Sequence, residues 1–299
     1  MNEKPLLTIV MPAYNEADNL VVILPPLLEL CRQRNWKIIL VNDGSVDKTK
    51  ETVLPFEGTD YFIALHHKLN KGYGAAIKTG IQACDTMYVI TIDADGQHTI
   101  TDIEKLFNCL QRNDADMVVG SRRGRKSESV SRGIGKSIIR TIAQMLMQVP
   151  IYDINSGMKI YLTALARKYI HLAPDTMAFS DIITLVFINN RHLVLEEPIT
   201  ISSRLKGKST IGMQTAFQTV MEIVNILVLF NPMKIFLPIS VLTFIVTLVW
   251  GLPLVLEGRG ISTGTLLGIV ATMIFFFLGL ITEQLSQIRR NQKQGFRDS

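Results

Sequence analysis

Two long apolar segments dominate the carboxyl-terminal part of the chain. Residues 235–256 contain no charged side chain, and a second uncharged run extends from 260 to 282. A helix that crosses a bilayer needs about 20 apolar residues, because hydrocarbon offers its backbone no hydrogen-bond partner. Only Glu257, Gly258 and Arg259 separate the two runs. The pattern predicts two transmembrane helices in a hairpin, with a pair of buried core helices as the alternative.

The first two thirds of the chain alternate short apolar runs with longer amphipathic stretches. Such alternation is typical of βα units around a mainly parallel sheet. The strands predicted in this way are 6–11, 37–41, 87–92 and 117–120, and the predicted helices are 15–30 and 101–111. We therefore expect an α/β domain at residues 1–210.

A third pattern connects this domain to the hairpin. Apolar positions between 213 and 228 recur at helical spacing, and only Glu222 among these residues is charged. We expect an amphipathic juxtamembrane helix at 211–232 on the membrane surface, and its packing on the α/β domain is the alternative. The hairpin and its tail then occupy residues 233–299.

The basic residues predict how the hairpin is oriented. Lys234 precedes the first span, and the tail after the second span reads RRNQKQGFRDS, whereas the connecting turn contains only Arg259. Lys and Arg are retained on the cytoplasmic side of a membrane. The first residues turn polar too soon for a secretory signal. We expect a two-span protein of the cell membrane whose ends and α/β domain are cytoplasmic.

The charge distribution and the cysteines indicate which partners and cysteine chemistry to expect. The net charge is +5, with basic residues concentrated in the tail and in residues 121–140. This distribution suits anionic lipid and phosphate better than a nucleic acid, so no nucleic-acid partner is expected. Cys31, Cys84 and Cys109 form no CxxC pair. Buried thiols are therefore expected rather than disulfides or a zinc site.

A polar cluster follows each of three predicted strands. The clusters read PAYNE, NDGS and DADGQ. Ligands of open α/β sheets bind beyond the carboxyl ends of the strands, so the clusters should converge on one site. Asp93 and Asp95 of the third cluster can bind one hard divalent cation, Mg²⁺ or Mn²⁺, which a nucleotide diphosphate needs to neutralise its charge. The alternative is a pair of turn-forming and helix-capping aspartates.

These clusters resemble motifs of the family 2 glycosyltransferases. The matching stretches are VMPAYNE at 10–16, VNDGSVDKT at 41–49, NKGYGAA at 70–76, DADGQH at 93–98 and GSR at 120–122. Further stretches are similar to the branch of dolichyl-phosphate mannosyltransferases and bacterial polyprenyl-phosphate glycosyltransferases: DINSGMK at 153–159, Glu197-Pro198 and RLKGKS at 204–209.

The resemblance implies a GT-A fold and a defined reaction. A hexose would be transferred, with inversion, from a nucleotide diphosphate sugar of the GDP-mannose or UDP-glucose type. The acceptor would be a polyprenyl phosphate, dolichyl or undecaprenyl, at the cytoplasmic membrane face.

The resemblance also implies roles for single residues. Those implied to hold the nucleoside are Pro12, Tyr14, Glu16 and Asp43. Asp93 and Ala94 would contact the donor, and Asp95 and Gln97 would ligate the metal, with Asp93 as a further candidate ligand. Those implied to bind phosphates are Arg122, Arg132, Arg204 and, more weakly, Lys206. The predicted catalytic set is Asp93, Asp95, Arg122 and Arg132.

Three positions leave open questions. Asn42 replaces the first aspartate of the common DDGS form, so Asp43 is the one carboxylate left there and the donor base stays open. Asp181 stands where the branch often has a glutamate, and no catalytic role is assigned to it. His98 directly follows the DADGQ cluster and could ligate a metal, but packing or capping is the commoner role of such a residue.

Two other functions remain open from the sequence. One is a membrane glycosyltransferase that extends a polysaccharide, although the chain lacks a QxxRW signature and two spans are few for a secretion channel. The other is a non-catalytic membrane subunit that binds nucleotide sugar. Small residues of the second span, Gly264, Gly268 and Ala271, could also pack the hairpin against a copy of itself, which would make a homo-oligomer.

Overall fold

The computed structural model describes residues 4–122, 150–154, 156–200, 228 and 232–291. The chain divides into two compact units, and each is described by itself. The first comprises residues 1–132 and 149–211, and the second comprises residues 133–148 and 212–299. The predicted boundary at 210 and almost all of the predicted juxtamembrane helix at 211–232 lie outside the described residues and stay predictions.

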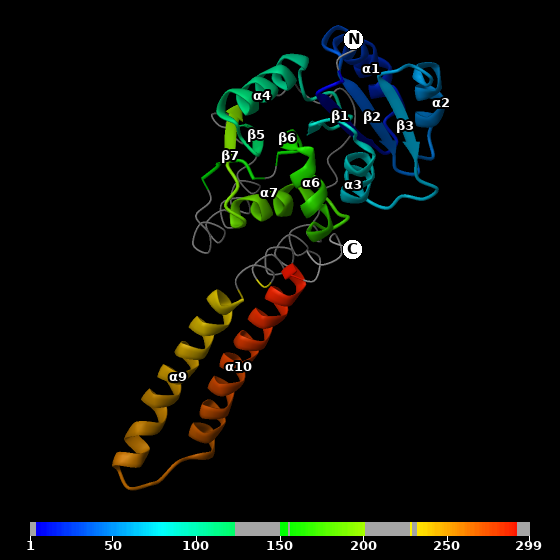
Figure 1. Cartoon of the computed structure of the whole chain (residues 1–299). Helices are drawn as coiled ribbons and strands as arrows, with labels where there is room; N and C mark the ends of the chain where they lie inside the picture. Colours follow the sequence, from blue (N-terminus) through cyan, green and yellow to red (C-terminus); the bar gives the residue numbers. More distant parts are fainter. Residues whose placement is uncertain (1–3, 123–149, 155, 201–227, 229–231, 292–299) are drawn as a thin grey trace. The chain divides into compact units, whose positions relative to one another are not determined.

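A mixed sheet forms the centre of the first unit (Figure 1). Its seven described strands are β1 (Leu7–Ala13), β2 (Lys37–Asn42), β3 (Phe62–His66), β4 (Tyr88–Thr91), β5 (Met117–Ser121), β6 (Lys159–Leu162) and β7 (Val194–Pro198). They lie in the order β3-β2-β1-β4-β6-β5-β7. β3, β2, β1 and β4 pair in parallel with one another, β6 is antiparallel to both β4 and β5, and β7 is parallel to β5. The predicted mixed, mainly parallel sheet is confirmed.

Helices flank this sheet and bury its apolar strands. The described helices are α1 (Ala17–Arg34), α2 (Thr49–Val53), α3 (Tyr73–Ala83), α4 (Ile100–Asn113), α6 (Thr163–Tyr169) and α7 (Phe179–Asn189), with short 3₁₀ turns at η1 (Leu54–Phe56) and η2 (Ile170–Leu172). Every residue of β1 is buried, as expected for a parallel strand covered on both faces. Phe107 of α4 packs edge-on against Trp36 and Tyr88, with ring centroids 5.1 and 5.7 Å apart. These contacts fix α4 against the sheet.

The cysteines follow the sequence expectation in part. Cys31 and Cys84 are buried free thiols, and burial raises the pKa of each to about 12. Cys109 is also a free thiol but is half-buried.

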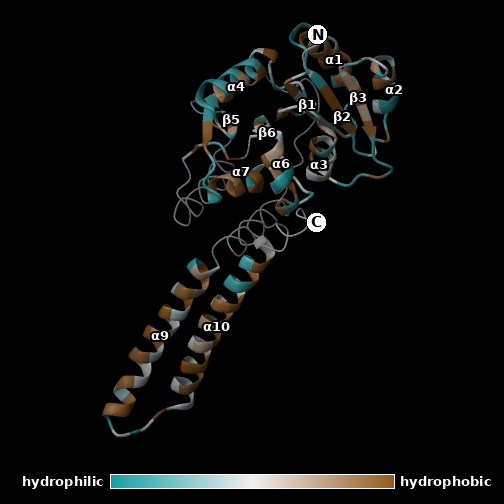
Figure 2. Ribbon diagram, viewed as in Figure 1, coloured by the Kyte–Doolittle hydropathy of each residue, from teal (hydrophilic) through white to brown (hydrophobic). Residues whose placement is uncertain are grey.

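The second unit contains a hairpin of two long apolar helices, α9 (Met233–Leu256) and α10 (Thr263–Asn291) (Figure 2). Both have the length and hydropathy needed to cross a bilayer, α10 over Thr263–Ile288. The two predicted spans are therefore confirmed as helices, and the second begins three residues later than predicted.

Small residues allow α9 and α10 to approach each other closely. A Cβ added to Gly268 would lie 2.2 Å from Oγ1 of Thr247, and one added to Gly251 would lie 2.4 Å from Cγ2 of Thr265. The Ser240 hydroxyl donates to the carbonyl of Thr272 at 3.0 Å. Gly268, which was considered for packing between copies, thus packs inside the hairpin of one chain.

Candidate functional site

The polar clusters predicted to converge do lie at one edge of the sheet. In the parallel register Ala13 pairs with Asn42, and Val10 pairs with Thr91. The residues that follow β1, β2 and β4 therefore leave the sheet on the same side. This is the edge where open α/β sheets bind ligands.

The first two clusters hold each other through hydrogen bonds. Asn15, in the left-handed region at φ 57°, accepts the N–H of Val46 on its side-chain oxygen at 2.9 Å. Its own N–H donates to the Ser45 hydroxyl at 2.9 Å, and the N–H of Glu16 donates to Thr49. Among the predicted nucleoside contacts here, Pro12 is buried, Tyr14 is 46% exposed, and Glu16 accepts from Asn19.

Asp43 organises the loop that follows β3. Its buried carboxylate accepts the backbone N–H of Lys71 at 2.9 Å and of Gly72 at 2.8 Å, and its Oδ1 lies 2.6 Å from Nδ1 of His67. Asn42, the departure from the family pattern, accepts the N–H of Ser45 at 3.0 Å. The sequence had suggested neither anchoring role.

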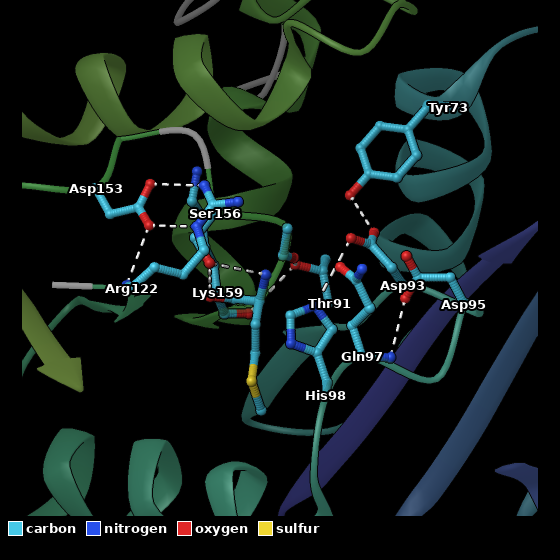
Figure 3. A network of polar contacts seen from close by, with 12 residues as sticks. Tyr73, Thr91, Asp93, Asp95, Gln97, His98, Arg122, Asp153, Ser156 and Lys159 are labelled. Atoms are coloured by element: carbon cyan, nitrogen blue, oxygen red, sulfur yellow. Dashed lines mark hydrogen bonds and ion pairs between the residues drawn. The ribbon is translucent and has the colours of Figure 1, made fainter. Parts of the chain in front are cut away.

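The DADGQ cluster forms a tight turn after β4 (Figure 3). Gly96 has φ 75°, and the N–H of Gln97 donates to Oδ1 of Asp95 at 3.1 Å. Asp95 and Ala94 are buried, whereas the Asp93 side chain is 33% exposed. The turn thus presents Asp93, Asp95 and Gln97 from one short segment.

Two side chains contact Asp93, and the charge of a third acts on it. The Tyr73 hydroxyl donates to its Oδ1 at 2.9 Å, and Nε2 of His98 lies 3.7 Å from its Oδ2. Burial by itself raises the pKa of Asp93, but His98, the Tyr73 hydroxyl and the positive charge of Arg122 outweigh it, so the pKa lies below its ordinary value. Asp93 is therefore a carboxylate at neutral pH.

Arg122 is paired with Asp153 in a two-point ion pair. Nε of Arg122 lies 2.6 Å from Oδ2 of Asp153, and Nη2 lies 2.8 Å from Oδ1. Glu196 in turn accepts the backbone N–H of Asp153 at 2.9 Å. Burial raises the pKa of Asp153, yet the hydrogen bonds and charge of Arg122 outweigh it and leave the pKa below its ordinary value. The Arg122 side chain, 35% exposed, is thereby fixed in one orientation.

A buried lysine lies beneath this pair. The Lys159 ammonium donates to the carbonyls of Ile154, at 2.7 Å, and Ser180. Burial lowers the pKa of Lys159 far below that of an exposed lysine, and the neighbouring charges of Asp181 and Asp153 only partly oppose this. Lys159 therefore joins the segment before β6 to the start of α7, which carries Asp181.

Arg132, Arg204 and Lys206 lie outside the described residues, so their predicted phosphate contacts stay predictions. Tyr73, Asp153, Gly157 and Lys159 were given no role from the sequence, although they belong to the stretches NKGYGAA and DINSGMK. Those stretches were visible as similarity, but nothing in their spacing indicates that they reach Asp93 and Arg122.

The donor set at the turn fits a hard divalent cation. Asp95 offers carboxylate oxygen and Gln97 offers an amide oxygen, the ligand types that Mg²⁺ and Mn²⁺ prefer. Within the described ranges, no group of three or more His, Cys, Asp or Glu side chains could hold a metal ion. A cation here would take its remaining ligands from substrate phosphates and water, as Mg²⁺ commonly does.

The fold and the site together define an α/β domain with a polar ligand site at one sheet edge, in a chain that also carries a hairpin of two long apolar helices. Comparison with known protein families gives two matches. The family Glycosyl transferase family 2 matches residues 8–171, and the GtrB C-terminal hairpin matches residues 231–288. The chain therefore belongs to glycosyl transferase family 2, and it is a glycosyltransferase of the polyprenyl-phosphate sugar synthase type with a membrane hairpin.

Curated relatives support this assignment. An uncharacterized protein of Methanocaldococcus jannaschii is 34% identical over 54% of this chain and 67% of the relative. The polyprenol monophosphomannose synthase of Mycolicibacterium smegmatis is 28% identical over 67% and 79%. The dolichyl-phosphate beta-glucosyltransferase of Dictyostelium discoideum is 25% identical over 75% and 76%. Among the relatives compared, the matched part spans from 40% to 79% of the relative's length.

Solved structures support the fold. Glucosyl-3-phosphoglycerate synthase from Mycobacterium tuberculosis, in complex with Mn²⁺, UDP-glucose and phosphoglyceric acid, has a TM-score of 0.58 at 14% identity. The likeness covers 75% of this chain and 79% of that chain. The first unit is thus a GT-A-like domain, as the sequence predicted.

Proposed function

We propose that the chain transfers a hexose from a nucleotide diphosphate sugar to polyprenyl phosphate at the cytoplasmic face of the cell membrane. The observation that carries the proposal is the cluster after β4, where Asp93 and Asp95 lie in one turn. The positive charge of Arg122 also helps to lower the pKa of Asp93. GDP-mannose and UDP-glucose are the two donor types that we propose, by analogy with relatives named as mannose and glucose transferases.

The nucleoside is proposed to bind at the ends of β1 and β2, against Pro12, Tyr14, Glu16 and Asp43. Asp43 already accepts hydrogen bonds from Lys71, Gly72 and His67. A carboxylate offers about four acceptor sites, so Asp43 can hold its loop and still accept one hydrogen bond from a base or ribose.

Mg²⁺ or Mn²⁺ is proposed to bind Asp95 and Gln97, with Asp93 as the further candidate ligand. The bound ion would neutralise the negative charge that develops on the departing diphosphate. Glucosyl-3-phosphoglycerate synthase has been solved with Mn²⁺ and with Mg²⁺, each together with UDP. That pairing in a protein of the same fold supports the proposed cofactor.

The acceptor phosphate is proposed to attack without a protein base. A phosphate monoester has a second pKa of about 6, so it is already anionic at neutral pH. One of its oxygens bonds to the anomeric carbon from the face opposite the diphosphate, the carbon–oxygen bond to the diphosphate breaks, and the nucleoside diphosphate leaves. Asp93 would orient the donor sugar, and Arg122, Arg132, Arg204 and Lys206 would hold the phosphates.

The proposal is tested by replacing one carboxylate oxygen. Asp95→Asn in the full-length detergent-solubilised enzyme should reduce Mn²⁺-dependent transfer from labelled UDP- and GDP-hexoses to undecaprenyl phosphate by about 100-fold or more. Asp60→Asn, a change of the same kind at an exposed loop position before β3, should leave the rate unchanged. Full metal-dependent activity in Asp95→Asn would show that the metal site is assigned wrongly.

A further inference from the structure

The Tyr73 side chain contacts the DADGQ turn, which lies 20 residues further along the chain. It is the first residue of α3, and its hydroxyl donates to Oδ1 of Asp93 at 2.9 Å (Figure 3). We propose that Tyr73 is a positioning residue, whose hydroxyl holds the Asp93 carboxylate in the orientation that sugar transfer requires. This inference rests on the proposed function, because it assigns Asp93 to the donor.

The Asp93 carboxylate is confined on its other sides as well. Nε2 of His98, whose side chain is 7% exposed, lies 3.7 Å from Oδ2. A Cβ added to Gly157 would lie 2.3 Å from the same oxygen and 2.8 Å from Oδ1. The Asp93 carboxylate can lie here only because residue 157 is a glycine and has no Cβ. The 33% of the Asp93 side chain that stays exposed leaves a face that a donor can reach.

Tyr73 is itself held on both sides in the chain. The N–H of Gly72 donates to Oδ2 of Asp43 at 2.8 Å, and the N–H of Gly74 donates to the carbonyl of Asp175 at 2.8 Å. Gly72 has φ 101°, and a Cβ there would lie 2.5 Å from the same Asp175 carbonyl. Because the backbone on both sides of Tyr73 is held, little conformational entropy is lost when the phenol donates its hydrogen bond to Asp93, and this favours the hydrogen bond. The same loop joins Asp43, at the proposed nucleoside site, to Asp93.

The protonation states suit a hydrogen bond to a charge. Burial and the neighbouring charge of Asp93 raise the pKa of Tyr73 well above its ordinary value, so the hydroxyl keeps its proton. Asp93 stays ionised, as described above. Hydrogen bonds to charged acceptors are about twice as strong as neutral ones.

The decisive variant removes only the hydroxyl. Tyr73→Phe should lower kcat by about ten- to hundredfold, the factor that corresponds to one hydrogen bond to a charged group, while KM for the donor changes by less than about threefold. Tyr88→Phe is the matched control, because Tyr88 begins β4, the strand that leads to Asp93, and its ring packs on Phe107. Equal thermal midpoints of the two variants would separate positioning from stability. A kcat of Tyr73→Phe within about threefold of wild type would overturn the inference.

A second variant acts on the same carboxylate from the opposite side. Gly157 has no positive φ, so alanine suits its backbone, and the added methyl group meets Asp93 directly. Gly157→Ala should lower kcat strongly. In the double variant Gly157→Ala/Tyr73→Phe, the factor by which kcat falls should be smaller than the product of the factors measured for the two single variants. Fully multiplicative losses would mean that the two residues act separately, which contradicts the proposal.

A structural readout keeps this inference distinct from the proposed function. In a crystal structure of full-length Tyr73→Phe, the Asp93 carboxylate should leave its wild-type orientation or occupy more than one. An unchanged single orientation overturns the inference even if wild type transfers no sugar. Conversely, a wild type inactive with every labelled hexose donor refutes the proposed function alone.

Discussion

Arg122 and Asp153 show how single residues prepare the site before any substrate arrives. Two parallel hydrogen bonds fix the guanidinium plane, and Glu196 holds the backbone of Asp153. A fixed guanidinium binds a phosphate with less loss of side-chain entropy than a mobile one. The aspartate therefore matters both for the fold and for the proposed phosphate contact.

Replacing this aspartate should reduce stability in a pH-dependent way. We expect Asp153→Asn to lower the free energy of unfolding at pH 6 by about 2 kcal/mol, less than for a fully buried pair because Arg122 is partly exposed. The pKa of Asp153 is depressed in the folded state relative to 3.8, so its stabilisation is present above pH 3.8 and is lost as the pH falls through the folded pKa. The difference between wild type and variant should thus shrink below about pH 4.

Denaturant unfolding in detergent between pH 3 and 6 measures this difference. Asp175→Asn is the control, because Asp175 forms an exposed ion pair with Lys78 at 2.6 Å. Such surface pairs contribute about 0–1 kcal/mol. A gap between wild type and Asp153→Asn that stays constant down to pH 3 would contradict the predicted linkage.

Among the elements, those with a regular local pattern were predicted and the others were not. β1, β2, β4 and β5 and helices α1 and α4 lie within a few residues of their predicted bounds. β6 has only four residues and α7 is buried along most of its length, so neither shows a clear period. β3 is an edge strand with one fully buried residue, which leaves little alternation to recognise.

The hairpin allows a matched pair of substitutions in one helix. Gly268→Leu should push α10 away from Thr247 and lower the thermal midpoint in detergent by several degrees, since overpacking costs about 1–3 kcal/mol. Gly264 has no atom nearer than 3.8 Å to an added Cβ, so Gly264→Leu should have little effect. Equal losses in both variants would show that α9 and α10 do not pack through Gly268.

For the whole molecule, the proposed orientation is directly measurable. In a chain with Cys109→Ser, Ile261→Cys in the turn between α9 and α10 should react with a membrane-impermeant maleimide added to sealed right-side-out vesicles. Asp60→Cys on the α/β domain should react only after permeabilisation, because the basic tail and Lys234 favour a cytoplasmic location of both ends. The reverse labelling pattern would place the α/β domain outside.

The sequence by itself determined the α/β class, the two spans and the meeting of three polar clusters at one sheet edge. Each follows from a local property: hydrophobic length, hydrophobic period, or the position of polar residues after a strand. The DxD turn was likewise recognisable, because all its residues lie in one segment.

Only the tertiary structure decided which side chains surround that turn. β6 lies antiparallel between β4 and β5, and the segment before it brings Gly157 against Asp93. The loop before α3 brings Tyr73 to the same carboxylate from 20 residues away. Strand order and register result from packing the whole core, so no local pattern records which distant residues they bring together.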